Sequence, residues 1–435
     1  MAATTTTEGP APAGTAQDCG CPEDTGITRR TFLKAAGAAG ALTIASEAYA
    51  TRYAFADAVY TGDVFVVLSL RGGFDGLQAI VPAADPDYLD RRPNVGIPAN
   101  ALLQLDATFG MHPALAPLKP LYDAGTLGFV HAVGQAEPNR SHFEAMEEME
   151  RAAPGASTRT GWIDRVLGGR GEGTPFQGVQ MGSTMPAHAF TGPSPELAMW
   201  SVNGFGLDAA WDENERDRWD HALRRMYQDA RAALAAPAHV ALEAMSTTAD
   251  LQEQTYVPAN GAVYPNTDLG RALKDVARLI KAQVGLQVAC VDYGDWDMHA
   301  GMGDVDGGWM VDHLDELSTA LAAFAQDLGT QMDGVTLVSL TEFGRRIEEN
   351  GSGGTDHGFG QLVFLLGGGV RGGQVHGQWP GLADDDLIDG DLNGTTDYRR
   401  ILAEILEDRC GAGSLSDVFP DLGSERLNVV QARVT

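Results

Sequence analysis

The sequence predicts an α/β protein of three layers, in which helices cover both faces of a mostly parallel sheet. Short continuous apolar runs alternate along the chain with longer amphipathic segments, a pattern typical of buried strands alternating with surface helices. Several apolar runs end in glycine-rich loops that carry acidic residues or histidines. Because alternating strands and helices favour parallel pairing, ligands are expected beyond the carboxyl ends of the strands.

The first predicted elements are a strand at 63–70, a helix at 113–122, a strand at 127–133 and a helix that opens at residue 141. The first strand runs into a glycine loop at 71–76, as a strand does where its crossover begins. Leucines recur at helical spacing within 113–122, and Gly125 suits a helix C-terminus. Ser141 and Glu144 have the S-x-x-E form of a capping box.

The middle of the chain gives a weaker pattern. Residues 151–216 are rich in Gly, Pro, Ser and Thr, which indicates surface excursions or a small cap. Residues 217–234 predict an amphipathic helix, an irregular stretch follows, and Thr267 is expected to cap a helix that ends near residue 284. We therefore expect one domain over 51–435, with a possible cap or insertion at about 151–265.

The last third repeats the rhythm of strand, loop and helix. The predicted elements are strands at 286–291, 335–340 and 361–366 and helices at 314–328 and 397–406. A loop dense in acids at 292–303 follows the first of these strands, and a glycine-rich loop that ends near residue 358 follows the second. Both loops are expected at the carboxyl edge of the sheet.

The N-terminus predicts a twin-arginine signal peptide over residues 1–50. Arg29 and Arg30 precede a large apolar pair and Lys34, and the apolar stretch at 35–45 is too short to span a bilayer. Ala48-Tyr49-Ala50 offers a signal peptidase site. We expect the Tat translocase to export the folded protein, which would then be periplasmic or secreted.

Composition limits the partners of the mature chain. The net charge is -29, and removing the three basic and five acidic side chains of the first 50 residues leaves 27 basic against 54 acidic ones. This acidic balance argues against nucleic acid and anionic lipid as partners. No later apolar run reaches the length of a membrane span, so stable membrane insertion is not expected. Only Cys290 and Cys410 follow residue 50, which excludes a disulfide framework.

Four loops at predicted strand ends carry possible metal ligands. The possible ligands are Asp75 in the first loop, Asp297 and His299 in the second, Glu342 in the third, and Asp356 and His357 in the fourth. Carboxylate oxygens and imidazoles brought to one sheet edge suit one or two divalent ions, of zinc, manganese, magnesium or calcium. Taken singly, each has an ordinary structural interpretation, as a turn residue, a polar loop or an ion pair of Glu342 with a following arginine. Their joint placement favours a metal site.

Ser141 is the candidate nucleophile, because a serine at a helix N-terminus gains from the helix dipole when it becomes an alkoxide or carries a phosphoryl group. The same hydroxyl is equally well explained as the N-cap of the helix. The flanking Arg140 and His142 either bind an anionic substrate or are solvated.

These motifs resemble a bacterial family known as domain of unknown function 1501, which is placed among the alkaline-phosphatase-like and sulfatase-like folds. The segments that carry the resemblance follow one another through the mature chain. They are Leu70-Arg71-Gly72-Gly73-Phe74-Asp75-Gly76, Asn139-Arg140-Ser141-His142-Phe143, Trp296-Asp297-Met298-His299, Glu342-Phe343-Gly344-Arg345 through Asp356-His357-Gly358, and Thr395-Thr396-Asp397-Tyr398-Arg399.

The resemblance implies an α/β/α domain with metals at the strand ends and a nucleophile that opens a helix. It makes Asp75 the metal aspartate after the first strand and Ser141 the nucleophile. Glu342 stands where phosphatases place an Asp-His pair, but Phe343 replaces that histidine. His357 resembles the last metal histidine; in a rival alignment Asp356 and His357 form the Asp-His pair and His376 is the last ligand.

The expected function is that of an exported metal-dependent hydrolase of phosphate or sulfate esters, acting on a small-molecule or polysaccharide ester. The alternative is a non-catalytic exported protein of the same fold that binds an envelope partner or a glycan. Fold resemblance alone does not decide between these two classes.

Overall fold

The computed structural model describes residues 60–433, apart from 171–172 and 208–212. The predicted twin-arginine signal lies outside the described residues and stays a prediction. Among the described helices, none combines the length and the apolar character that crossing a membrane requires. Cys290 and Cys410 are both buried and free.

A nine-stranded sheet forms the centre of the molecule, with the strand order β13-β5-β12-β9-β1-β8-β6-β7 and β14 paired to β5. The strands are β1 Val64–Leu70, β5 Leu127–Gly134, β6 Gly178–Met181, β7 Leu197–Met199, β8 Val288–Tyr293, β9 Val335–Leu340, β12 Gln361–Gly367, β13 Val375–His376 and β14 Thr396–Asp397. The register places Val66 of β1 between Ala289 of β8 and Leu337 of β9. All pairings of this sheet are parallel except the two made by β12. The prediction of a mostly parallel sheet is confirmed.

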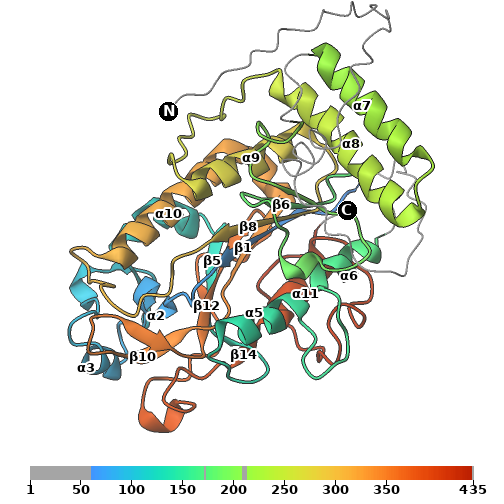
Figure 1. Ribbon diagram of the computed structural model, residues 1–435. Helices are drawn as coiled ribbons and strands as arrows, with labels where there is room; N and C mark the ends of the chain where they lie inside the picture. Colours follow the sequence, from blue (N-terminus) through green and yellow to red (C-terminus); the bar gives the residue numbers. More distant parts are fainter. Residues whose placement is uncertain (1–59, 171–172, 208–212, 434–435) are drawn as a thin grey trace, which may run out of the picture.

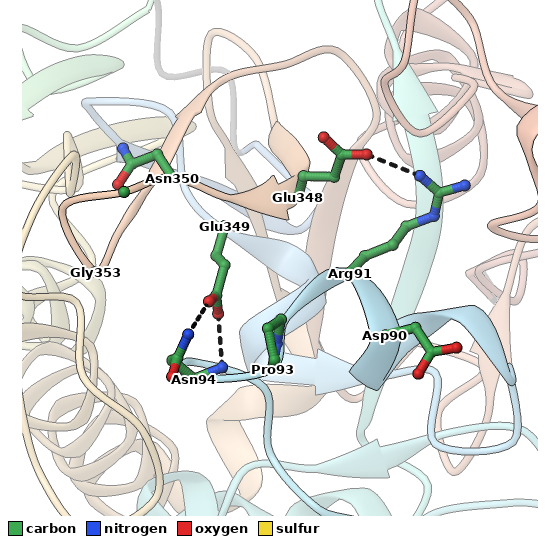
Figure 2. Close-up of a pocket in the computed structure, with 9 residues that line it drawn as sticks. Asp90, Arg91, Pro93, Asn94, Glu348, Glu349, Asn350 and Gly353 are labelled. Carbon is green, nitrogen blue, oxygen red and sulfur yellow. Dashed lines mark hydrogen bonds and ion pairs between the residues drawn. The ribbon is translucent and has the colours of Figure 1, made fainter.

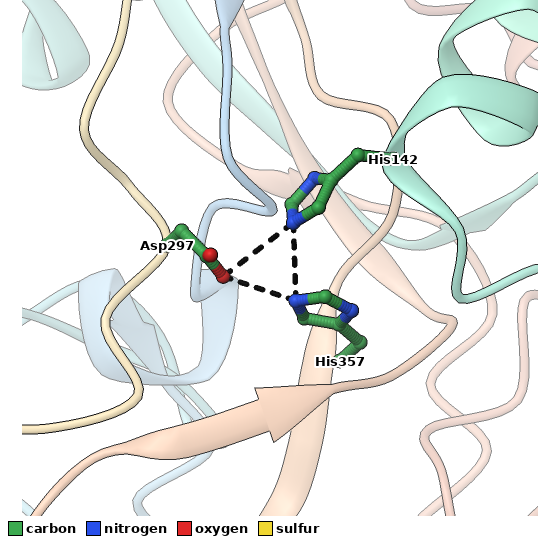
Figure 3. Close-up of side chains that lie close together, drawn as sticks. All are labelled: His142, Asp297 and His357. Carbon is green, nitrogen blue, oxygen red and sulfur yellow. Dashed lines mark hydrogen bonds and ion pairs between the residues drawn. The ribbon is translucent and has the colours of Figure 1, made fainter.

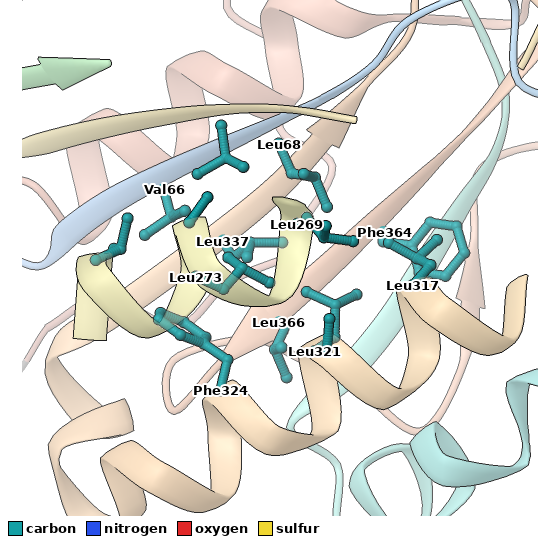
Figure 4. Packing of buried hydrophobic residues seen from close by; sticks show 14 of the residues in the cluster. Val66, Leu68, Leu269, Leu273, Leu317, Leu321, Phe324, Leu337, Phe364 and Leu366 are labelled. Atoms are coloured by element: carbon teal, nitrogen blue, oxygen red, sulfur yellow. The ribbon is translucent and has the colours of Figure 1, made fainter. Parts of the chain in front are cut away.

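Helices cover both faces of this sheet (Figure 1). Successive residues of a strand point to opposite faces, so Val66 and Leu68 of β1 pack in one core and Phe65 and Val67 in the other. The first core includes α9 Asp268–Ala282 and α10 Trp309–Leu328, whose leucines meet β1, β9 and β12 (Figure 4). The second includes α6 Trp162–Gly168, α11 Tyr398–Asp408 and Met149 of α5 His142–Arg151.

Two small sheets complete the strand inventory. β2 Ile80–Val81, β3 Leu103–Gln104 and β4 Gly110–Met111 form one sheet, and β10 Arg345–Glu349 and β11 Thr355–His357 form an antiparallel hairpin. The hairpin occupies residues predicted as a glycine loop. It follows the carboxyl end of β9, so the chain re-enters the main sheet from that edge and β12 runs antiparallel.

Of the remaining helices, α8 Ala232–Gln252 adds Val240 and Ala244 to the first core, and most of the others are short. These others are α2 Gly76–Ala79, α3 Asp87–Arg91, α4 Lys119–Asp123, α7 Glu213–Gln228 and the 3₁₀ turns η1 Ala99–Ala101, η2 Pro113–Leu118, η3 His188–Phe190, η4 Gly329–Gly334 and η5 Asp384–Asp386. The predicted helix at 113–122 is split into η2 and α4 because prolines 117 and 120 lack the N–H that an α-helix needs.

The segment 151–265 departs from its prediction in two places. β6 and β7 extend the main sheet, so this part is an edge of the core rather than a surface excursion. The stretch expected to be irregular after residue 234 contains most of α8, which packs beside α7 at one end of the molecule (Figure 1). Thr267 caps α9 as predicted, its hydroxyl accepting the N–H of Gly270 at 3.2 Å.

Candidate metal centre

Three imidazoles and one carboxylate converge at the carboxyl edge of the main sheet. Nε2 of His357 lies 3.1 Å from Nε2 of His142, 2.9 Å from Nε2 of His299 and 3.0 Å from Oδ1 of Asp297. The same oxygen of Asp297 lies 3.1 Å from Nε2 of His299 and 3.5 Å from Nε2 of His142. Figure 3 shows two of the imidazoles pointing at each other and at the carboxylate.

Each donor comes from a segment that follows a strand of the sheet. His142 is the first residue of α5, after β5; Asp297 and His299 lie in the loop after β8; and His357 ends β11, in the hairpin after β9. β5, β8 and β9 all run in the same direction, so their carboxyl ends meet at one edge. These four side chains therefore gather at the edge of the sheet where ligands are expected in folds of this kind.

The second nitrogen of every imidazole faces an acceptor. His142 Nδ1 lies 2.7 Å from Oε1 of Glu342, and His299 Nδ1 lies 2.8 Å from Oδ1 of Asp356. His357 Nδ1 lies 2.9 Å from the carbonyl oxygen of Arg140. Carboxylates and carbonyls only accept, so in the neutral rings the proton sits on Nδ1 and the Nε2 lone pair is free. This is the arrangement of histidines that ligate a metal.

The four inward-facing atoms are thus all acceptors. Neutral Nε2 atoms and an ionised carboxylate oxygen about 3 Å apart repel one another unless a proton or a cation lies between them. Asp297 stays ionised: partial burial opposes the shift, but its bonds to Arg345 and His357 and the charge of Arg345 hold its pKa below the ordinary value. A cation would turn the mutual repulsion of these atoms into coordination.

The spacing of the donors fits a small divalent ion. Two ligands of a tetrahedral zinc ion with bonds of about 2.0–2.1 Å lie roughly 3.3 Å apart, and the separations among Nε2 of His142, Nε2 of His357 and Oδ1 of Asp297 are 3.0, 3.1 and 3.5 Å. The two nitrogens and one oxygen of this group, with the nitrogen of His299 beside that of His357, suit zinc better than magnesium or calcium, which prefer sets of oxygen ligands.

Arg345 joins the loops that carry the centre. Its guanidinium is fully buried and donates to Oδ1 of Asp297 at 2.6 Å. It also donates to the carbonyl oxygens of Gly73, Trp296 and Thr355 at 2.5, 3.0 and 3.0 Å and to that of Gly72. One cation therefore binds the loops after β1 and β8 to the β10–β11 hairpin, and Asp297 is held in place from behind.

The glycine loop after β1 makes room for the histidines. Phe343 is buried and packs against the rings of His142 and His357, with centroids 4.8 and 4.7 Å apart. A Cβ on Gly73 would lie 2.5 Å from the Phe343 ring, and Gly73 has a φ of +76°. The N–H of Gly72 donates to Oε1 of Glu342 at 2.9 Å. Phe343, which stands where phosphatases have a histidine, thus supports the rings of His142 and His357 by packing against both.

The predicted ligands divide into three groups in the structure. Asp297, His299 and His357 point donor atoms into the centre, whereas Glu342 and Asp356 accept from Nδ1 atoms and do not face it. The remaining two lie elsewhere.

Asp75 and His376 have other partners. Asp75 is buried against Arg92, with oxygen–nitrogen distances of 2.9 and 3.0 Å, and also accepts from Thr355 and the N–H of Gln78. His376 pairs with Val130 in mid-strand, four residues before the end of β5, and its Nε2 lies 2.7 Å from the carbonyl oxygen of Arg371. The structure does not bring either residue into the histidine cluster.

The predicted catalytic residues also differ in their settings. The capping box is not formed: Ser141 makes no side-chain capping bond, and its N–H donates to Oδ1 of Asn139 at 2.8 Å. Arg140 is paired with the buried carboxylate of Asp391. His142, for which contact with an anionic substrate and solvation were both open, points Nε2 at that of His357 in the centre. The sequence signal for its role was its position at a helix start beyond a strand, which applied equally to Ser141.

Fold and site together define an α/β protein with a candidate metal centre at the carboxyl edge of its sheet. Residues 130–404 match the family described as Protein of unknown function (DUF1501), and the chain belongs to this family. The matched segment contains all four converging residues. No curated protein matches the chain.

One solved structure similar to the chain is a phosphonate monoester hydrolase of Agrobacterium radiobacter. It is 11% identical, with 81% of this chain and 78% of that chain covered and a TM-score of 0.30. A likeness of this size carries no argument about fold or activity.

Proposed function

We propose that the protein is an exported, zinc-dependent hydrolase of phosphate or sulfate esters, with an alkaline-phosphatase-like arrangement of its sheet and site. The observation that carries the proposal is the convergence of His142, His299, His357 and Asp297, whose inward atoms are all acceptors. When bound, zinc would supply a Lewis acid that polarises the ester oxygen and offsets negative charge in the transition state.

The site is open enough to receive a substrate. The side chains of Asp297 and His299 are 45% and 43% exposed, and His142 and His357 are partly exposed. Structural zinc sites are closed and catalytic sites keep a position for substrate or water. This exposure favours a catalytic role.

Ser141 lies one residue before a donor and is partly exposed at the N-terminus of α5. Because its hydroxyl makes no capping bond, it is available as a nucleophile, and the first N–H groups of the helix would stabilise negative charge beside it. Attack by Oγ on phosphorus or sulfur would form a serine ester as the bond to the alcohol oxygen breaks, and the hydroxyl proton of Ser141 would pass to the departing alkoxide. Water would then release the inorganic anion.

Export by the Tat translocase fits this assignment. The donors span residues 142–357 and converge only in the folded chain, so a site of this kind gains its metal after folding. Tat transport of a folded protein would deliver the loaded enzyme to the periplasm or the medium.

The test joins metal content to turnover. We expect elemental analysis of protein produced in an export-competent host to find zinc, and the protein to hydrolyse 4-nitrophenyl phosphate or 4-nitrophenyl sulfate. Ser141→Ala should lower kcat by about three orders of magnitude or more with zinc retained, as loss of a nucleophile does. Ser424→Ala, at an exposed serine, is the matched control. Turnover that survives Ser141→Ala would refute the role of this serine.

A second candidate is a non-catalytic exported protein that binds an envelope partner or a glycan. The observation in its favour is that the buried side chains of Arg345 and Glu342 hold Asp297 and His142 in place, which suits a rigid structural site. It predicts bound zinc, no turnover of either ester, and partner capture that survives Ser141→Ala.

A further inference from the structure

A cavity of about 630 Å³, lined largely by charged and polar side chains, lies against the tip of the β10–β11 hairpin that carries His357. One wall is the end of α3 with Asp90 and Arg91 and the turn after it with Asn94, and the other is the end of β10, with Glu348 and Glu349, and the hairpin tip (Figure 2). Its volume falls within the range of small-molecule sites, about 300–1,000 Å³.

The hairpin tip belongs to both the cavity and the centre. Asn350 lines the cavity, and its Nδ2 donates to the carbonyl oxygen of His299 at 2.9 Å and to Oδ1 of Asp356 at 3.0 Å. A Cβ on Gly354 would lie 2.3 Å from the carbonyl oxygen of Met298, so the tip is packed directly against the donor loop. A ligand in the cavity would therefore lie beside the centre.

The strand register gives the scale of this separation. Glu349 pairs with Thr355, two residues before His357. At about 3.3 Å per residue this is roughly 7 Å along the strand. One sugar ring spans such a gap.

The cavity wall is prearranged and rich in acceptors. Glu349 accepts the N–H groups of Asn94 and Val95, both at 2.8 Å, and Arg91 pairs with Glu348 at 3.0 Å. Asp90 and Glu348 remain exposed, so their carboxylates are accessible to hydroxyl donors. The cavity is lined by three carboxylates and by the single guanidinium of Arg91. This excess of negative charge repels an anionic ligand, and the carboxylate oxygens can accept hydrogen bonds from hydroxyl groups.

We infer that this cavity binds the alcohol part of the substrate, and that this part is a neutral sugar ring whose ester group reaches the metal centre. The inference rests on the proposed function, because it assigns the ester to the centre and the ring to the cavity. A uronic acid or a heavily sulfated ring would meet the carboxylates of the cavity wall and is disfavoured.

The experiment fills the cavity and compares two esters. Gly351 lines the cavity and a Cβ there meets nothing within 4 Å, so Gly351→Trp places an indole in this space without a backbone clash. Gly413→Trp is the matched control, because that glycine also has open space around it. In the zinc-loaded full chain, kcat/KM is measured for glucose 6-phosphate and 4-nitrophenyl phosphate, or for the two corresponding sulfates.

We expect Gly351→Trp to lower the sugar-to-nitrophenyl ratio of kcat/KM by about tenfold or more, the effect of losing one or two charge-assisted hydrogen bonds. Gly413→Trp should leave the ratio unchanged. An unaltered ratio in Gly351→Trp, or a preference for glucuronic acid esters, would overturn the inference.

A binding measurement separates this inference from the proposed function. Saturation-transfer NMR with methyl glucoside on the full chain should give a signal that Gly351→Trp removes, even if no ester is hydrolysed. Absence of zinc and of turnover would refute the proposed function alone. Absence of the glucoside signal, or calcium binding that Asp90→Asn abolishes in its place, would refute the sugar site.

Discussion

Replacing Glu342 by glutamine should weaken zinc binding far more than it weakens the fold. Oε1 of Glu342 accepts from Nδ1 of His142 at 2.7 Å and from the N–H of Gly72 at 2.9 Å. A glutamine carbonyl can keep both bonds but carries no charge. Outer carboxylates of this kind contribute about 10–100-fold to metal affinity, which is roughly 1.4–2.7 kcal/mol.

The matched control is Asp356→Asn, which makes the same change beside His299. The side chain of Glu342 is 1% exposed and that of Asp356 is 57% exposed, so water screens the charge of Asp356 much more. Competition with a chromophoric chelator measures the zinc Kd of both variants, and the melting temperature of the zinc-free proteins measures the stability of the fold. Equal losses of affinity in the two variants would contradict the reasoning, because burial would then have no effect.

Two further predictions concern buried groups. Arg345→Lys should lower the free energy of unfolding by about 3 kcal/mol or more, because an ammonium group leaves several buried carbonyl acceptors unpaired. Urea unfolding measures this loss, with Arg346→Lys as the control. Equal losses of stability in the two variants would contradict the prediction. Burial lowers the pKa of His131 to about 4 from 6.5, so below pH 6.5 the unfolded chain takes up a proton that the folded chain refuses. Stability should therefore be fully present above pH 6.5 and fall by about 1.4 kcal/mol per pH unit towards pH 4, and His131→Gln should flatten this slope in a series of melting curves unless other groups dominate the acid transition.

The pattern of apolar residues in the sequence was enough to predict the strands and helices that carry a strong apolar signal. The strand predicted at 335–340 is β9 with identical bounds, and the cap at Thr267 is formed as expected. The hairpin of β10 and β11 was missed because its strands are short and charged, so they lack the alternation that marks a half-buried strand. The direction of β12 could not be read either, since a strand buried on both faces has the same composition in either direction.

The site shows the same division more sharply. The sequence by itself determined that histidines and carboxylates follow several strands, and parallel topology then requires such loops to share one edge. Only the tertiary structure decided which side chains point inward, because a donor and an outer acceptor differ by a few ångströms and not by residue type. Asp75 pairs with Arg92 and so does not face the site. His142 does face it, because Nδ1 of its ring bonds to Glu342, which is 200 residues away in sequence. Such long-range pairings depend on packing between loops, which local sequence patterns do not encode.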